Sequence, residues 1–170
     1  FWAFRGFPGR RAAAYVAAQC LGAILASPLL RAAFPQAATL GQTLPTAGVW
    51  PAFVLEAVLT FILMFVILQV STKAMEVGLM AGVAVGGVVL FEALFAGPAC
   101  GASMNPARSL GPALVADDLT HLWIYLLAPC AGAILACGAA RVVMGRAAWD
   151  DAVCRPDDPA CAAACACGKS

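Results

Sequence analysis

The stretch GASMNPARS, residues 101–109, decides how the rest of the chain is interpreted. Asn105 followed by Pro106 is a helix-start signal, because Asn is a good N-cap residue and Pro is tolerated at the first helical position, where its missing N–H would have no partner. Apolar residues continue to Val115, so the predicted helix has about ten residues and is about 15 Å long. That is about half the hydrocarbon thickness of a bilayer, so this helix does not cross a membrane.

Four apolar runs surround this short helix, at residues 12–30, 50–70, 77–95 and 123–143. Each run has about 20 residues, which is enough to cross a hydrocarbon core of about 30 Å. Irregular backbone at membrane depth survives only where it is buried in protein or lines a watery cavity. The sequence therefore predicts an all-α, multi-pass transmembrane helix bundle with four spanning helices and one re-entrant half-helix.

The composition agrees with a membrane protein and excludes several functions. The chain has 170 residues, of which 11% are charged and 63% are hydrophobic, whereas soluble domains average about 25% charged residues. The net charge is +1, so no strong field recruits nucleic acid. We also expect no enzyme, no cofactor and no metal site in the spans, since the chain has one His and no nucleophile beside a base.

The placement of Lys and Arg predicts the orientation, because cytoplasmic flanks carry the excess of positive charge. If the four spans alternate, one side receives Arg5, Arg10, Arg11, Lys73, Arg141 and Arg146, and the other side receives Arg31 and Arg108. The first side is then cytoplasmic. The loop with Asn105 and Arg108 enters the membrane from outside.

A half-helix of this kind points its free N–H groups and its positive dipole end toward the middle of the membrane. Cations and protons are disfavoured there. The amide of Asn105 can donate hydrogen bonds to a neutral solute, and the guanidinium of Arg108 offers fixed donors about one turn further on. Because an intramembrane Arg is costly, it is by default functional.

Residues 97–113, GPACGASMNPARSLGPA, resemble the second signature loop of the aquaporin (major intrinsic protein) family. Residues 53–56, FVLE, resemble the start of the fourth helix of that family, and residues 123–129, WIYLLAP, resemble its sixth helix. Residues 5–19 are similar to the link from the first half-helix into the third helix. The resemblance covers roughly residues 1–146 and is most similar to the nodulin-like branch and its bacterial relatives.

The resemblance implies a fold of six spanning helices and two half-helices, arranged as inverted repeats. We therefore expect this chain to hold an incomplete version, with the first two helices and the first Asn-Pro-Ala motif upstream of Phe1. Such a chain is not expected to conduct as a monomer. The family also implies a homotetramer for the full-length protein, in the cell membrane, with the lipid bilayer, water and small neutral solutes as its partners.

The family's pore residues carry over position by position. Asn105, Pro106 and Ala107 are implied for the central constriction, and Arg108, Ala102 and Ala93 for the selectivity filter. Because both filter alanines are small, the resemblance implies a wide and weakly polar opening. The nodulin-like branch implies water, glycerol, small amides and undissociated metalloid acids as permeants.

Two glutamates and one histidine lie at the ends of the apolar runs or inside them. The resemblance implies that Glu56 buries a carboxylate that accepts hydrogen bonds from the re-entrant loop; a proton-relay acid is the alternative. Glu92 departs from the family pattern and has no assigned role. His121 is expected to be solvated or to cap the last span, and a pH switch is the alternative.

Gly78, Gly82 and Gly86 recur on one face of the third run, and small residues at this spacing let two membrane helices approach closely. We predict tight helix packing there. Residues 147–170 are predicted to form a cytoplasmic, disordered tail. Its four thiols, Cys154, Cys161, Cys165 and Cys167, are interpreted as incidental, and a soft-metal or trivalent arsenic site is the alternative.

The sequence thus predicts an aquaporin-like passive channel for water and small uncharged solutes, with residues 1–146 as the membrane domain. A non-conducting membrane fragment or scaffold is the main alternative. A second alternative is a transporter that uses the broken helix to hold an anionic substrate. A metalloid-binding protein based on the tail cysteines is the third.

Overall fold

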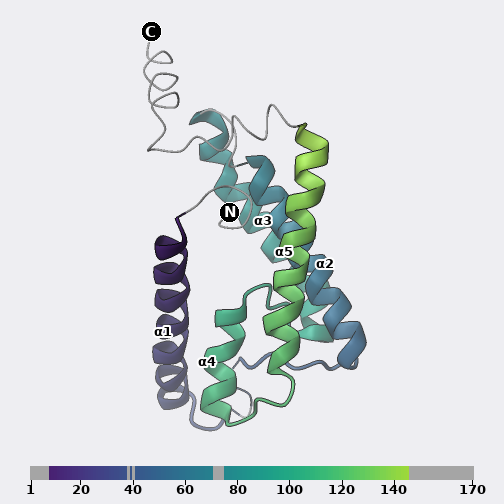
Figure 1. Cartoon of the computed structure of the whole chain (residues 1–170). Coiled ribbons are helices and arrows are strands. Elements are labelled where there is room, and N and C mark those ends of the chain that lie inside the picture. The colour runs from purple at the N-terminus through teal and green to yellow at the C-terminus, as the bar shows by residue number, and fades with distance from the viewer. Residues whose placement is uncertain (1–7, 38, 40, 71–74, 146–170) are drawn as a thin grey trace.

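The computed structural model describes residues 8–37, 39, 41–70 and 75–145, and these residues contain five helices and no strand (Figure 1). The helices are α1 (Gly9–Ala33), α2 (Val49–Val70), α3 (Met75–Cys100), α4 (Pro106–Ala116) and α5 (Leu122–Met144). All of them except α4 are long and apolar enough to cross a membrane. The predicted all-α bundle of four spanning helices and one half-helix is confirmed. The chain is a multi-pass membrane protein.

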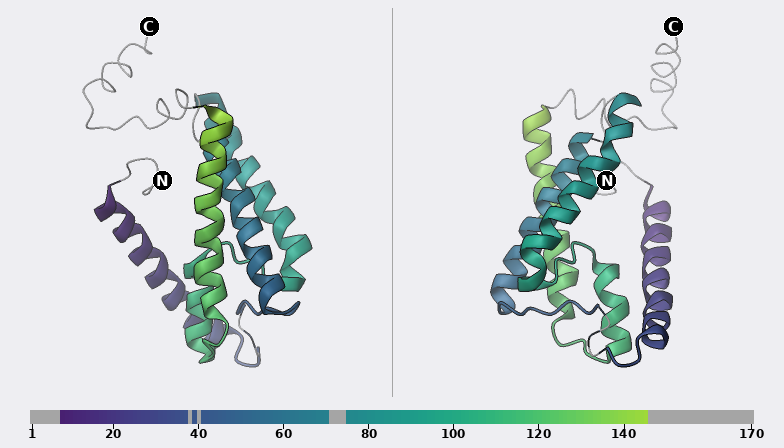
Figure 2. Two further views of the ribbon diagram at one scale, coloured as in Figure 1. Left: turned by 45° about the vertical axis from the view of Figure 1, so that its right-hand side comes forward. Right: turned by 180° about the vertical axis from the view of Figure 1, so that it is seen from behind.

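Helix α2 is the centre of the arrangement, because it packs along both α5 and α3. Helix α1 stands to one side, and among the described helices it contacts only α4, as both views of Figure 2 show. Helix α4 therefore lies between α1 and α5 and joins α1 to the rest of the bundle. The predicted tail, residues 147–170, lies outside the described residues.

Helix α4 is short because its sequence carries a start signal and a stop signal. It begins at Pro106, one residue after Asn105, whose side chain accepts a hydrogen bond from the Ala107 N–H. It ends before Asp117, which adopts a left-handed conformation with φ 55° and donates its N–H to carbonyls of the last turn. The predicted range, Pro106 to Val115, is one residue shorter than the observed helix. In Figures 1 and 2 the first turn of α4 lies near mid-height of the bundle and its last turn near one end.

Two glycines allow α4 and α5 to approach their neighbours. A Cβ atom at Gly111 would overlap the carbonyl oxygen of Ala23 in α1, and a Cβ atom at Gly132 would overlap the carbonyl oxygen of Ala57 in α2. The backbones of these helix pairs are therefore in direct contact, as small residues permit in membrane helices.

The prediction that the glycine row of the third run packs tightly is wrong for the described residues. Nothing lies within 4 Å of a Cβ atom built at Gly82 or Gly86. The side of α3 that is buried carries Glu92, Ala96 and Cys100 instead. Spacing identifies a small-residue face, but it does not identify the helix that covers it.

Candidate functional site

The loop between α3 and α4 enters the bundle with an irregular backbone. Three of its residues have positive φ angles: Gly101 (86°), Ala102 (41°) and Met104 (52°). A left-handed conformation costs a residue with a Cβ atom about 1 kcal/mol or more, so it persists only where neighbouring contacts hold it. Because Ala102 and Ser103 are both buried, these contacts come from the protein and not from water.

Glu56 of α2 supplies the strongest of these contacts. Its Oε1 accepts a hydrogen bond from the Ser103 N–H at 2.8 Å, and its Oε2 accepts one from the Met104 N–H at 2.9 Å. The side chain is fully buried. Hydrogen bonds to an ionised group are roughly twice as strong as neutral ones, so a single buried carboxylate fixes two consecutive peptide groups of the loop.

Asn105 lies where this loop becomes helix α4. Its Oδ1 is occupied by the Ala107 N–H at 3.0 Å, so the amide is oriented with its oxygen toward the helix. The two hydrogens on Nδ2 then remain available to a solute. They stand beside the N–H groups of the first turn, and all of these groups are donors.

Arg108 lies one turn further along α4, and its side chain is exposed. Its Nη1 donates a hydrogen bond of 2.7 Å to the carbonyl oxygen of Gly41, in the connection between α1 and α2. Because this contact uses only part of the guanidinium, further donors are left for a solute. The predicted constriction residues and Arg108 therefore share one loop and one helical turn.

The two predicted filter alanines differ in exposure: Ala102 is buried and Ala93 is exposed. Ala102 is 8% exposed and packs with Cys100 and Tyr125 in the core next to the loop. Ala93 is exposed on α3, about two turns before the helix ends at Cys100. No contact of the described chain brings them together, so their shared role in a filter stays a prediction.

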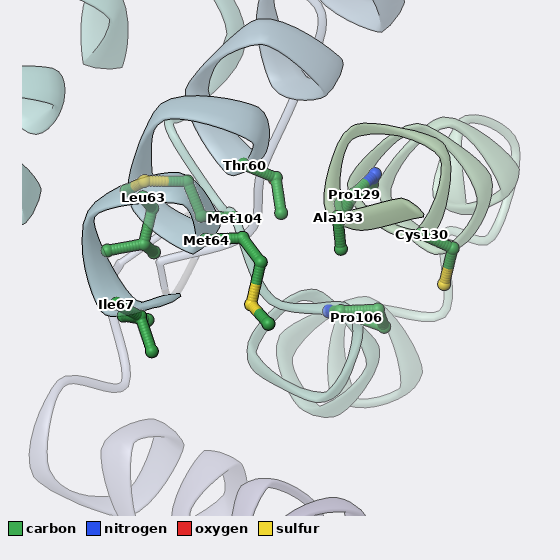
Figure 3. Close-up of a pocket in the computed structure, with 9 residues that line it drawn as sticks. All are labelled: Thr60, Leu63, Met64, Ile67, Met104, Pro106, Pro129, Cys130 and Ala133. Atoms are coloured by element: carbon green, nitrogen blue, oxygen red, sulfur yellow. The ribbon is translucent and has the colours of Figure 1, made fainter. Parts of the chain in front are cut away.

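A cavity of about 270 Å³ opens beside the start of α4 (Figure 3). Its walls come from α2, α5 and the re-entrant loop, and Met104 and Pro106 form the side next to the half-helix. The lining residues are Thr60, Leu63, Met64, Ile67, Met104, Pro106, Pro129, Cys130 and Ala133. This lining is almost wholly apolar. A space with apolar walls beside the start of the half-helix suits a small neutral solute and offers no counter-charge to an ion.

The connection between α1 and α2 contributes contacts that the sequence analysis missed. Gln42 Nε2 donates to the carbonyl oxygen of Asp118 at 3.1 Å, and Thr43 Oγ1 donates to Ser109 Oγ at 2.8 Å. Further along, the Ala47 N–H donates to the carbonyl oxygen of Ala99 at 2.9 Å. The connection thus lies across the re-entrant loop and α4. The only signal in the sequence was a cluster of Gln and Thr within a loop otherwise rich in Pro and Gly.

Glu92 is fully buried in α3, and neither of its carboxylate oxygens has a hydrogen-bond partner among the described residues. His121 is the residue before α5, and its side chain is partly exposed and makes no capping hydrogen bond. Of the two expected roles, capping is therefore wrong, and a solvated side chain stays the prediction. Near it, hydrogen bonds from the Thr120 hydroxyl and N–H hold the pKa of Asp118 below the ordinary value of 3.8.

A metal site is not formed by the residues that the structure describes, since no group of three or more His, Cys, Asp or Glu side chains comes together in them. Of the cysteines in the apolar runs, Cys100 and Cys137 are buried within the helix bundle. The tail thiols, Cys154, Cys161, Cys165 and Cys167, lie outside the described residues.

Comparison with known proteins gives one consistent result. The family model of the major intrinsic proteins matches residues 1–139. Aquaporin NIP1-4 of Oryza sativa subsp. japonica is 54% identical over 128 residues, which cover 75% of this chain and 47% of that relative. Nodulin-26 of Glycine max is 49% identical over 135 residues, covering 79% of this chain and 50% of that relative. Aquaporin NIP6-1 of Arabidopsis thaliana is 42% identical over 143 residues, covering 84% of this chain and 47% of that relative.

These relatives confirm the predicted likeness to the nodulin-like branch. The chain spans about half the length of the relatives that it matches.

Proposed function

This chain belongs to the major intrinsic protein family, and from that premise we propose that it forms part of the wall of a passive transmembrane channel for water and small uncharged solutes. The observation that carries the proposal is the half-helix α4. It starts after the capping residue Asn105, beside an apolar cavity whose lining includes the flanking residues Met104 and Pro106. Permeation through such a wall needs no chemical step, so the proposal does not include an enzyme.

The chemistry of the site supports selection for neutral solutes. Asn105 Nδ2, the N–H groups at the start of α4 and the guanidinium of Arg108 are all donors, and the dipole of α4 adds positive potential at the same point. A neutral solute with lone pairs, such as water or glycerol, is accepted there. A cation meets a positive field and apolar walls that cannot replace its hydration shell.

Each pore residue has a proposed role. Asn105, Pro106 and Ala107 form the constriction; Arg108, Ala102 and Ala93 form the filter; and Glu56 braces the loop through its two backbone hydrogen bonds. The small alanines leave room for solutes larger than water. We therefore extend the proposal to glycerol, small amides and undissociated metalloid acids.

The assembly and location follow from the family and belong to the same proposal. We place the protein in the cell membrane, with the cytoplasmic side at the end of the bundle where α1 begins and α5 ends. We also propose a homotetramer as the full assembly, and residues 1–146 as the membrane domain.

The test is flux into vesicles reconstituted with the protein in the length that its gene encodes. Stopped-flow light scattering measures shrinkage under an osmotic gradient, followed by re-swelling as glycerol enters. A channel shortens both phases relative to protein-free vesicles of the same lipid. If both phases are as slow as in the protein-free vesicles, the channel proposal fails, and the protein is better described as a non-conducting scaffold.

A further inference from the structure

Thr43 is buried although it belongs to the connection between α1 and α2. Its exposed fraction is 5%, while Gly41 and Thr46 on either side of it are exposed. A Cβ atom at Gly101 would lie only 2.9 Å from Thr43 Cγ2, so the connection touches the backbone of the re-entrant loop at this point. A buried hydroxyl needs a hydrogen-bond partner.

The partner begins a chain of three hydroxyl groups. Thr43 Oγ1 donates a hydrogen bond to Ser109 Oγ at 2.8 Å, and Ser109 Oγ is hydrogen-bonded to Ser103 Oγ. Ser103 Oγ in turn donates a hydrogen bond to the carbonyl oxygen of Asn105 at 2.9 Å. This series of hydrogen bonds runs from the connection between α1 and α2, through the first turn of α4, to the backbone of Asn105 where α4 starts.

The direction of this chain is fixed by its hydrogens. Each hydroxyl carries one hydrogen. Ser103 uses its hydrogen on the Asn105 carbonyl, so it must accept from Ser109, and Ser109 must accept from Thr43. Ser103 and Ser109 are 6% and 1% exposed. Water therefore has little access to replace a donor that is lost from the chain.

The end of the chain is the peptide group that orients Asn105. The carbonyl of Asn105 also accepts the Ser109 N–H at 3.4 Å, a long hydrogen bond that is weak on its own. The hydrogen bond from the Ser103 hydroxyl is therefore the shorter of the two that this carbonyl accepts. The Asn105 carbonyl and side chain are attached to the same Cα atom, so a displacement of this part of the backbone also displaces the Nδ2 hydrogens.

We propose that Thr43 is a positioning residue for the constriction: its hydroxyl, acting through Ser109 and Ser103, sets the orientation of Asn105. The outer connection then controls the donor geometry at the half-helix without touching the solute. This inference deepens the proposed function and rests on it only where flux is measured. Hydrogen exchange tests it without any assumption about conduction.

The first experiment is hydrogen–deuterium exchange of the purified protein in detergent micelles, followed by mass spectrometry of peptides that cover residues 101–109. Thr43→Val keeps the shape of the side chain and removes the hydroxyl. Thr43→Ser keeps the hydroxyl and removes the methyl group. Thr39→Val makes the same change as Thr43→Val at an exposed position of the same connection and is the matched control.

We expect Thr43→Val to speed exchange in residues 101–109 by about three- to tenfold, the effect of losing one net hydrogen bond. Thr43→Ser should restore the wild-type rate, and Thr39→Val should leave it unchanged. Peptides from the contact between α2 and α5 serve as the internal reference. The inference fails if Thr43→Val has no effect, if Thr43→Ser is equally fast, or if the reference peptides speed up to the same extent.

A second variant tests whether the three hydroxyls act as one unit. Ser109→Ala removes the middle of the chain and should speed exchange in the same peptides. Once the chain is broken at Ser109, Thr43→Val should add little, because contacts in one network are not additive. Full multiplication of the two rate increases would show two independent contacts and would overturn the inference.

The flux experiment then tests the consequence for selection. Thr43→Val should change the ratio of glycerol to water permeability, and Thr43→Ser should restore that ratio. An unchanged ratio in Thr43→Val would contradict the positioning role. If the wild-type protein shows no flux, the proposed function fails, while the exchange experiment still decides the role of Thr43.

Discussion

Replacing Glu56 with Gln is expected to destabilise the protein by about 3 kcal/mol. The carboxylate accepts the N–H groups of Ser103 and Met104 at 2.8 and 2.9 Å, one on each oxygen. A glutamine side chain has one oxygen, so it accepts one of these hydrogen bonds. Its NH₂ group faces the other N–H, and two donors then oppose each other in a fully buried site.

The magnitude follows from the two hydrogen bonds. A hydrogen bond to a charged group contributes about 1.5–3 kcal/mol and a neutral one about 1 kcal/mol. The substitution weakens one bond to the neutral value and loses the other, and the backbone N–H that is left without a partner costs about 1–3 kcal/mol. Glutamine is neutral, so the cost of burying the Glu56 charge disappears, and this offsets part of the lost stability. We take about 3 kcal/mol as the balance, and we expect faster hydrogen exchange in residues 101–104.

Glu92→Gln is the matched control, because it makes the same chemical change in the other fully buried glutamate of the described residues. Its oxygens have no partner there, so no hydrogen bond is lost, and we expect equal or greater stability. Unfolding in mixed micelles with increasing SDS, followed by circular dichroism, measures both variants. The account of Glu56 is refuted if Glu56→Gln costs no more than Glu92→Gln.

Three other perturbations test other parts of the structure. Gly132→Ala should cost about 1–3 kcal/mol in the same unfolding assay, since its Cβ atom would overlap α2. Gly138→Ala, where nothing lies within 4 Å, should gain up to about 1 kcal/mol from helix propensity; similar values for both would contradict the close contact. Arg108→Ala should raise the leak of cations into vesicles at least about fivefold, because a unit charge about 4 Å away contributes about 1 kcal/mol even in water; an unchanged leak would remove Arg108 from the barrier. The Thr120 hydrogen bonds lower the pKa of Asp118. The ionised carboxylate should therefore stabilise the turn at residues 118–121 above about pH 4, and this stabilisation should be lost as the pH falls through the lowered pKa. Exchange at residues 118–121 should show this loss, and Asp118→Asn should abolish the pH dependence.

The half-helix was predictable from the sequence because its determinants are local. Asn105 and Pro106 define its first turn through their own side chains, and the observed helix differs from the predicted one by a single residue at its end. The spans were predictable for a similar reason, since about 20 consecutive apolar residues suffice to identify each of them.

The contacts that hold the site were less predictable, because their partners are distant in the sequence. Thr43 and Ser109 are 66 positions apart, and nothing in the local pattern of either residue indicates the other. Gly132 had no conspicuous spacing but makes a backbone contact, whereas Gly82 belonged to a regular row and faces open space. The bracing bonds of Glu56 were implied by resemblance, and no pattern of the chain itself predicts them.

The most direct test of the central claim is to measure glycerol entry and proton leak together, in the same vesicles, with an enclosed pH-sensitive dye. If the half-helix at Asn105 forms the wall of a passive channel, glycerol entry is fast, rises linearly with the glycerol gradient, and leaves the internal pH unchanged. Glycerol entry that saturates, or a pH gradient that collapses as glycerol enters, would contradict the claim.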